Sequence, residues 1–248
     1  MKNRLMLALL FAVLVEQAEP VVIDGGDFQS PLVIDGEIIN LSIASFKLDA
    51  SQVSNREFQA FVIANPAWQR EQIAGVFADQ NYLRHWQSTE EPGQAIADRP
   101  VTRVSWYAAR AYCQAQGGRL PERDEWEYVS MLVRQQDQIS DQQYAQQVFA
   151  WYNNPDPENM RAVASGVASN TGIHDLHGLV NEWVEDFQLL MTNGDDTDLL
   201  SGSCGDTARF MSSYDAAHYA TFLRYQSRSN YQPQSTASTL GFRCAYPL

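Results

Sequence analysis

"TRVSWYAARAYCQAQGGRLPERDEWEYVS", residues 102–130, combines helix caps, helix ends and a cysteine within 29 residues. Ser105 can cap a helix over residues 106–116, and the glycine pair at 117–118 can end that helix in a left-handed turn. A second helix is expected to begin with Pro121 in its first turn. Three acidic residues follow the proline and suit the positive end of the helix dipole. The stretch therefore predicts two consecutive helices joined by a tight turn.

The first of these helices carries Cys113, which could be a nucleophile, a metal ligand or half of a disulfide. The chain has three cysteines, Cys113, Cys204 and Cys244. Three is an odd number, so either one thiol stays free or one pairs outside the chain.

The composition is typical of a globular protein with a large hydrophobic core. The chain has 248 residues, of which 45% are hydrophobic and 11% aromatic. A chain of this length and composition can bury a large core as one domain without covalent cross-links. The formal net charge of -13 and the lack of a basic stripe exclude a nucleic-acid partner, because nucleic-acid binding depends on clustered Lys and Arg.

The N-terminus, "MKNRLMLALLFAVLVEQAEP", has the pattern of a signal peptide. Lys2 and Arg4 precede an apolar run over residues 5–15, and the small Ala18 follows. The apolar run is too short to span a bilayer. We therefore expect a signal peptide over residues 1–18, a single mature domain over 19–248, no membrane span after cleavage, and a periplasmic or secreted location where disulfides persist.

The first half of the mature chain alternates strand-like and helical patterns. Residues 19–47 combine short apolar runs with Gly and Asp, which predicts strands and tight turns. Residues 53–68 look helical, with Ser54 or Asn55 as the cap. Residues 66–100 hold aromatic side chains without a sustained period, so we expect a long irregular loop packed by aromatics.

The second half is harder to interpret. After Leu132 the sequence is rich in Gln and Asp, which predicts a connection. From residue 151 onward Gly, Asn, Asp and Ser are frequent, and short strands between long loops are expected.

Four segments carry a family resemblance: "VSNREFQAF", "RPVTRVSWYAARAYCQAQGGRLPERDEWEYVS", "NTGIHDLHGLVNEWVEDF" and "LGFRCA". In order and spacing they resemble the formylglycine-generating enzymes, also called sulfatase-modifying factor domains. The resemblance runs from about residue 40 to the C-terminus. It implies an α+β, variant C-type-lectin-like fold with much irregular structure and bound structural calcium.

The same resemblance implies a disulfide between Cys113 and Cys244, as in secreted members of the family. Closing a loop of about 130 residues would stabilise the fold by about 3 to 5 kcal/mol in the chain-entropy model. The alternative is that both cysteines are small buried apolar residues.

Formylglycine-generating enzymes bind copper(I) between two cysteines and use dioxygen to oxidise a substrate cysteine. Here "LLSGSCGDTARF" supplies only Cys204, immediately after Ser203, and the second copper cysteine is missing. Cys204 is the candidate catalytic residue of a copper-dependent protein-thiol oxidase. Its thiolate could bind copper with help from His218 or Met211, be oxidised to sulfenic acid, or pair with a partner protein. The alternative is a buried, inert thiol.

The resemblance places a calcium site in "DLHGLVNEW", with Asp175, Gly178, Val180 and Glu182 as ligands. Carboxylate and carbonyl oxygens from a tight loop suit calcium. The usual "GNVWEW" of the family is "GLVNEW" in this chain. The alternative is that Asp175 and Glu182 only cap turns.

The segment "DAAHYATFLRYQSRSN" resembles the branch of the family encoded beside copper nitrite reductases, for which an accessory role is supposed. This resemblance implies a substrate pocket with Arg224 and Arg228 at its base and His218 nearby. The alternative is that the two arginines pair with acidic neighbours such as Asp186.

These features predict an exported relative of the formylglycine-generating enzymes. It would be a divergent oxidoreductase, or a maturation or accessory factor that acts on a protein or peptide thiol or on a copper protein. The alternative is a non-catalytic, calcium-stabilised binding module of lectin-like fold.

Overall fold

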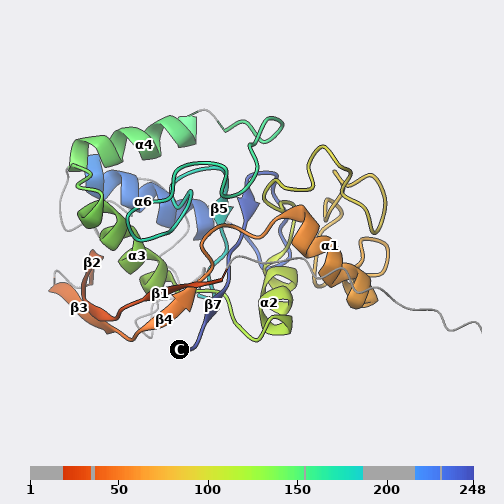
Figure 1. Ribbon diagram of the computed structural model, residues 1–248, viewed down its shortest axis with the longest axis horizontal. Coiled ribbons are helices and arrows are strands. Elements are labelled where there is room, and N and C mark those ends of the chain that lie inside the picture. Colours follow the sequence, from red (N-terminus) through yellow and green to blue (C-terminus); the bar gives the residue numbers. More distant parts are fainter. Residues whose placement is uncertain (1–18, 35–36, 154, 187–215, 230) are drawn as a thin grey trace, which may run out of the picture.

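The computed structural model describes residues 19–34, 37–153, 155–186, 216–229 and 231–248. Helices and short strands are separated by long irregular connections (Figure 1). In chain order the elements are β1 (Val21–Ile23), β2 (Gly26–Ile34), β3 (Glu37–Ile43), β4 (Phe46–Leu48), α1 (Asn55–Ala64), the 3-10 turn η1 (Pro66–Trp68), α2 (Trp106–Ala115), α3 (Arg123–Gln136), α4 (Asp141–Asn153), β5 (Asn181–Glu182), α6 (Ala216–Ser229), β6 (Leu240–Gly241) and β7 (Ala245–Tyr246).

The strands form three small sheets. An antiparallel sheet of order β1-β4-β7 joins the first described strand to the last one, with Val21 opposite Leu48 and Lys47 opposite Tyr246. β2 and β3 form an antiparallel hairpin, and β5 pairs with β6 in parallel. The two ends of the domain are therefore held together by backbone hydrogen bonds.

The caps predicted for the first two helices are confirmed. Ser54 caps α1 in a capping box with Glu57, in which each side chain accepts from the other residue's backbone N–H. The Ser105 side chain accepts from the Ala108 N–H at the start of α2, and Gly117, with φ 78°, follows its end.

The predicted start of α3 is wrong by two residues. Pro121 lies before the helix, and Glu122 is the N-cap. The Glu122 side chain accepts from the N–H of Glu125, whose own side chain accepts from the Glu122 N–H. The Pro121 carbonyl instead accepts from the Glu185 N–H at 2.9 Å, which ties the turn to another segment.

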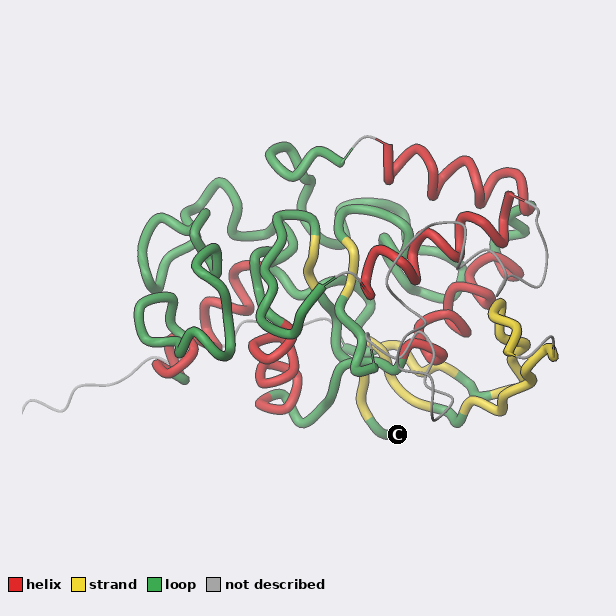
Figure 2. The backbone as a smooth tube through the Cα atoms, turned by 180° about the vertical axis from the view of Figure 1, so that it is seen from behind, coloured by secondary structure: helices red, strands yellow, loops and turns green. Residues whose placement is uncertain are grey.

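Two helices stand where the sequence predicted a connection and strands. Most of the Gln-rich segment forms α4, and α6 follows much later in the chain. They pack together through Tyr144, Ala145, Val148, Ala217 and Ala220, all buried. Figures 1 and 2 show α3, α6 and α4 stacked at one end of the molecule. None of the described helices has the length and apolar character needed to cross a membrane.

The segment from residue 66 to residue 100 is irregular and packed by aromatic side chains, as predicted. Tyr82 is 1% exposed and Trp86 is 3% exposed. The Trp86 indole N–H donates to the Asn55 side-chain oxygen at 2.8 Å, so the loop is anchored to the first residue of α1. Both rings belong to the main hydrophobic core.

Candidate functional site

A cavity of about 630 Å³, its open mouth included, lies between α3, α6 and β2, and we call it the α3–α6 cavity. Its polar wall includes Glu127, Ser130 and Arg134 from α3 together with Arg224 from α6. Residues three and four positions apart share one face of a helix, so α3 presents its three polar side chains to the same space. Phe28 of β2 contributes an apolar wall.

The floor of the α3–α6 cavity is a buried ion pair. The Arg224 Nη2 donates to the Glu127 Oε2 at 2.5 Å, and the two side chains are 4% and 3% exposed. The Arg224 guanidinium also lies over the rings of Trp126, 4.8 Å from the centroid, and Tyr144, 5.5 Å away. The ring stacking and the ion pair together fix the orientation of this guanidinium. If it turned away from Glu127, both side chains would carry a buried charge without a partner.

His177 connects this ion pair to Ser130. Its Nε2 lies 3.1 Å from the Ser130 Oγ, and its Nδ1 lies 3.4 Å from the Arg224 Nη1. A guanidinium only donates hydrogen bonds, so Nδ1 must be the acceptor. In the neutral ring the proton is then on Nε2 and is donated to the Ser130 oxygen.

This tautomer decides what the Ser130 and His177 pair can do. A histidine that activates a serine must accept the hydroxyl proton on the nitrogen that faces the serine. In His177 that nitrogen already carries a proton. In this tautomer the pair is therefore not arranged as a nucleophilic dyad.

The structure places one of the predicted pocket residues in this cavity. Arg224 pairs with the acidic side chain of Glu127, so for Arg224 the alternative of pairing with an acidic neighbour is confirmed, with Glu127 in the place of the example Asp186. The Asp186 side chain accepts from the Arg123 N–H at 2.7 Å. The backbone of His218 and Arg228 lies in α6, but their side chains are outside the described part of the structure. Cys204 lies outside the described residues as well.

A second buried ion pair joins Glu182 of β5 to Arg243. The Arg243 Nε and Nη2 each donate to one Glu182 carboxylate oxygen at 2.8 Å. Gln52 and Trp126 donate to the same carboxylate at 2.8 Å. The exposure of the two charged side chains is 1% for Glu182 and 0% for Arg243.

These contacts do not fit the calcium site expected from the resemblance. The Glu182 carboxylate is fully engaged by a resident cation, and the Asp175 carboxylate is paired with Arg161. The backbone oxygen of Gly178 accepts from the Val180 N–H at 2.8 Å. Both predicted carboxylate ligands are thus neutralised by arginines, whereas calcium needs six to eight free oxygen ligands.

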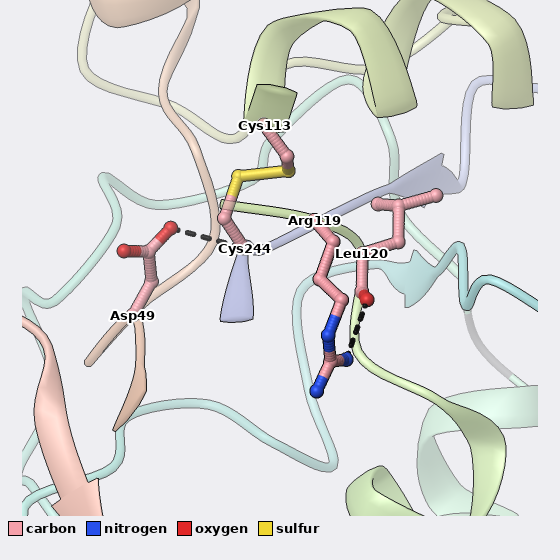
Figure 3. Close-up of a disulfide and its surroundings, with 5 residues drawn as sticks. All are labelled: Asp49, Cys113, Arg119, Leu120 and Cys244. Atoms are coloured by element: carbon pink, nitrogen blue, oxygen red, sulfur yellow. Dashed lines mark hydrogen bonds between the residues drawn. A yellow bond between two sulfur atoms is a disulfide. The ribbon is translucent and has the colours of Figure 1, made fainter. Parts of the chain in front are cut away.

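Cys113 and Cys244 form a disulfide, which joins α2 to the segment before β7 (Figure 3). Both residues are 0% exposed. Two of the three cysteines in the chain are therefore unavailable as thiolates, and Cys204 is the third. A copper(I) site made of two thiolates from this chain does not fit this cysteine set. Among the described residues, no three His, Cys, Asp or Glu side chains are grouped so that they could hold a metal ion.

Asp49 is a titratable group next to the disulfide. Its Oδ2 accepts from the Cys244 N–H at 2.9 Å (Figure 3). Burial raises the pKa of the Asp49 carboxyl to about 6, against the lowering effects of the Cys244 N–H, the Tyr246 hydroxyl and the Arg243 charge. Since the pKa is higher in the folded state, folding favours the protonated form of Asp49.

Asp49→Asn is expected to change how stability depends on pH. In the wild type the stabilising contribution of protonated Asp49 is complete below about pH 4 and is lost as pH rises through about 6. Asparagine does not titrate and can still accept from the Cys244 N–H. As pH rises from 4 to 7, the wild type should therefore lose about 1 to 2 kcal/mol more of its free energy of unfolding than the variant loses. This range allows for the partial exposure of Asp49. Urea unfolding of both proteins at one-unit pH steps measures this, and a constant difference would contradict it.

Sequence reasoning missed Glu127, Ser130, Arg134 and the role of His177. The available signal was the spacing "ExxSxxxR" in "EYVSMLVR", which puts the three α3 side chains on one helix face. The sequence does not show that this face meets Arg224, which is 97 residues away from Glu127 along the chain.

Comparisons with known proteins identify the family. A family model described as "Sulfatase-modifying factor enzyme 1-like domain" matches residues 11–248. The inactive C-alpha-formylglycine-generating enzyme 2 of Bos taurus is 28% identical over 269 residues, covering 91% of this chain and 87% of that protein. The formylglycine-generating enzyme of Bos taurus is 28% identical over 252 residues, covering 83% of this chain and 66% of that enzyme.

A solved structure supports the fold. Treponema denticola variable protein 1 superposes with a TM-score of 0.56 at 17% sequence identity, over 92% of this chain and 95% of that chain. At this identity the likeness shows the fold alone, and it agrees with the irregular α+β architecture expected from the motifs. Because the family model covers nearly the whole sequence, this chain belongs to the family of sulfatase-modifying factor enzyme 1-like domains.

Proposed function

We propose that this protein is an exported maturation or accessory factor that binds a protein or peptide ligand and does not oxidise cysteine with copper. One observation carries the proposal: the disulfide between Cys113 and Cys244 leaves Cys204 as the only other cysteine of the chain. Copper(I) is held tightly by soft thiolate ligands, and the enzymes of this family use a pair of them. A chain with one thiol cannot supply that pair.

The relatives are compatible with a factor that lacks the oxidase activity. Both a formylglycine-generating enzyme and a protein named as inactive match this chain at 28% identity. The family fold is thus used by proteins named with the activity and without it. The resemblance of the α6 segment to members encoded beside copper nitrite reductases favours a copper protein as the partner.

The α3–α6 cavity is the proposed ligand-binding site. Its fixed ion pair, the Ser130 hydroxyl and the apolar Phe28 and Met131 provide both polar and apolar contacts. The rest of the lining is also largely polar, with Gln29, Asp141 and Thr221 beside these groups, so the cavity suits a ligand that carries polar or charged atoms. The tautomer of His177 supports binding over serine-based chemistry at the same place.

The test of this function is an oxidase assay. The mature protein is incubated with copper(I), dioxygen and a cysteine-containing peptide, and the peptide is analysed by mass spectrometry. We expect the peptide cysteine to remain unconverted, while an authentic formylglycine-generating enzyme under the same conditions converts it. Copper-dependent formation of formylglycine by this protein would overturn the proposal in favour of a divergent oxidoreductase that acts through Cys204.

A further inference from the structure

Arg134 presents an incompletely used hydrogen-bonding edge beside the α3–α6 cavity. Its Nη2 donates to Asp141, while its Nε is buried and has no hydrogen-bond partner. The guanidinium lies over the Tyr144 ring, 4.2 Å from the centroid. The Nε–H and Nη2 form one edge of the planar guanidinium, which matches the two oxygens of a carboxylate. Asp141 uses only half of that edge.

The bond between Arg134 and Asp141 is easily exchanged. The Asp141 side chain is 76% exposed, and exposed ion pairs contribute little to stability. Asp141 is also the first residue of α4, where the positive end of the helix dipole stabilises a carboxylate without a partner. A carboxylate that enters the cavity can therefore replace Asp141 on Arg134 without leaving a buried charge behind.

Ser130 supplies a second donor on the same helix face. Its oxygen accepts the Nε2 proton of His177, because Arg224 fixes Nδ1 of that ring as an acceptor. The hydroxyl hydrogen of Ser130 then remains to be donated, and no second partner for it is found among the described residues. Ser130 lies four residues before Arg134, so the two donors are neighbours on the surface of α3.

We propose that the α3–α6 cavity binds a small α-carboxylate, held by the Nε–Nη2 edge of Arg134 and by the Ser130 hydroxyl. On the cavity floor the charges of Glu127 and Arg224 cancel each other. The negative charge of the ligand is therefore balanced by Arg134, once Asp141 has moved away from it. Phe28 and Met131 of the cavity wall suit a short apolar side chain next to the carboxylate. This inference rests on the proposed function and names the ligand class for the same site.

The α-carboxylate could come from a free amino acid or from the C-terminus of a peptide. Calorimetric titrations with L-alanine, with trialanine and with trialanine C-terminal amide separate these cases. We expect trialanine to bind at least about tenfold more tightly than its amide, because the amide lacks the charge and one acceptor oxygen. Tighter binding of L-alanine than of trialanine assigns the site to free amino acids, and tighter binding of trialanine assigns it to peptide C-termini.

Variants locate the site. Arg134→Gln should abolish the preference for acid over amide, and Arg134→Lys, which keeps the charge without the fork, should reduce it. Ser130→Ala should weaken trialanine about five- to tenfold through the loss of one hydrogen bond to a charged group. Arg110→Gln is the matched control, since Arg110 pairs with Glu185 away from the cavity and should leave binding unchanged. Circular dichroism confirms that each variant is folded.

The outcomes separate this inference from the proposed function. Equal binding of trialanine and its amide would overturn the carboxylate inference. If Ala217→Leu, which narrows the cavity, weakens the binding of both probes, peptide binding in the cavity still stands. A preference for the acid that survives Arg134→Gln would place the carboxylate elsewhere and also overturn it. No binding of any of the three probes to the wild type would overturn both the inference and the cavity as the ligand site.

Discussion

Arg243→Met is expected to lower the free energy of unfolding by about 3 to 5 kcal/mol, because it leaves the Glu182 carboxylate buried without its counter-charge. The Arg243 guanidinium also donates to the backbone oxygens of Asp49, Ala50 and His174 at distances between 2.9 and 3.2 Å. Domains of this size are stable by about 5 to 15 kcal/mol in total, so the variant should be largely unfolded or poorly expressed. Urea unfolding followed by tryptophan fluorescence measures the loss.

Two further variants test the physical reason for this loss. Arg243→Met combined with Glu182→Leu removes both charges and should recover part of the stability, since the buried carboxylate is no longer uncompensated. Arg56→Met is the control at the surface: Arg56 pairs with Asp98, and the two side chains are 40% and 61% exposed. That variant should change stability by less than about 1 kcal/mol. A loss below about 1 kcal/mol in Arg243→Met itself would contradict the central position given to this ion pair.

Removing the disulfide with Cys113→Ala and Cys244→Ala is expected to lower the free energy of unfolding by about 5 kcal/mol. The bond spans 131 residues, so its loss frees a large loop in the unfolded chain. The size follows from the chain-entropy model, in which longer loops give larger effects.

The same result should be seen without mutation. Wild-type protein in a strong reductant should unfold at the urea concentration at which the double variant unfolds, and the reductant should leave the double variant unchanged. Equal stability of the oxidised wild type and the double variant would show that the disulfide does not stabilise the fold.

The caps and the core helices could be predicted because their signals are local. Ser54 and Ser105 each precede a segment with apolar residues at helical spacing, and each makes its capping bond within three residues. The disulfide was available only through the family resemblance, since the spacing of three cysteines does not select a pair.

The remaining helices could not be predicted because their apolar surface is small and is buried by a distant partner. α4 shows only Tyr144, Ala145 and Val148 as buried residues within a polar segment. These residues are covered by Ala217 and Ala220 of α6, which come much later in the chain. Tertiary packing, which a local pattern does not contain, stabilises both helices.

The charged interactions of the candidate site are equally non-local. Glu127 meets Arg224 across 97 residues, and Glu182 meets Arg243 across 61. Arg224 was proposed for a pocket from the resemblance, but its partner depends on how α3 and α6 pack. The calcium ligands were expected from the same resemblance. The resemblance does not show that Asp175 and Glu182 each form an ion pair with an arginine.

A copper(I) titration of the protein without residues 1–18 against a competing chelator, with Cys204→Ser measured in parallel, tests whether the chain binds copper through its third cysteine. We expect the chelator to retain the copper and the two proteins to behave alike, because a single thiol cannot form the two-thiolate site. Stoichiometric copper(I) binding by the wild type that is lost in Cys204→Ser would contradict the absence of a copper site and identify Cys204 as a copper ligand.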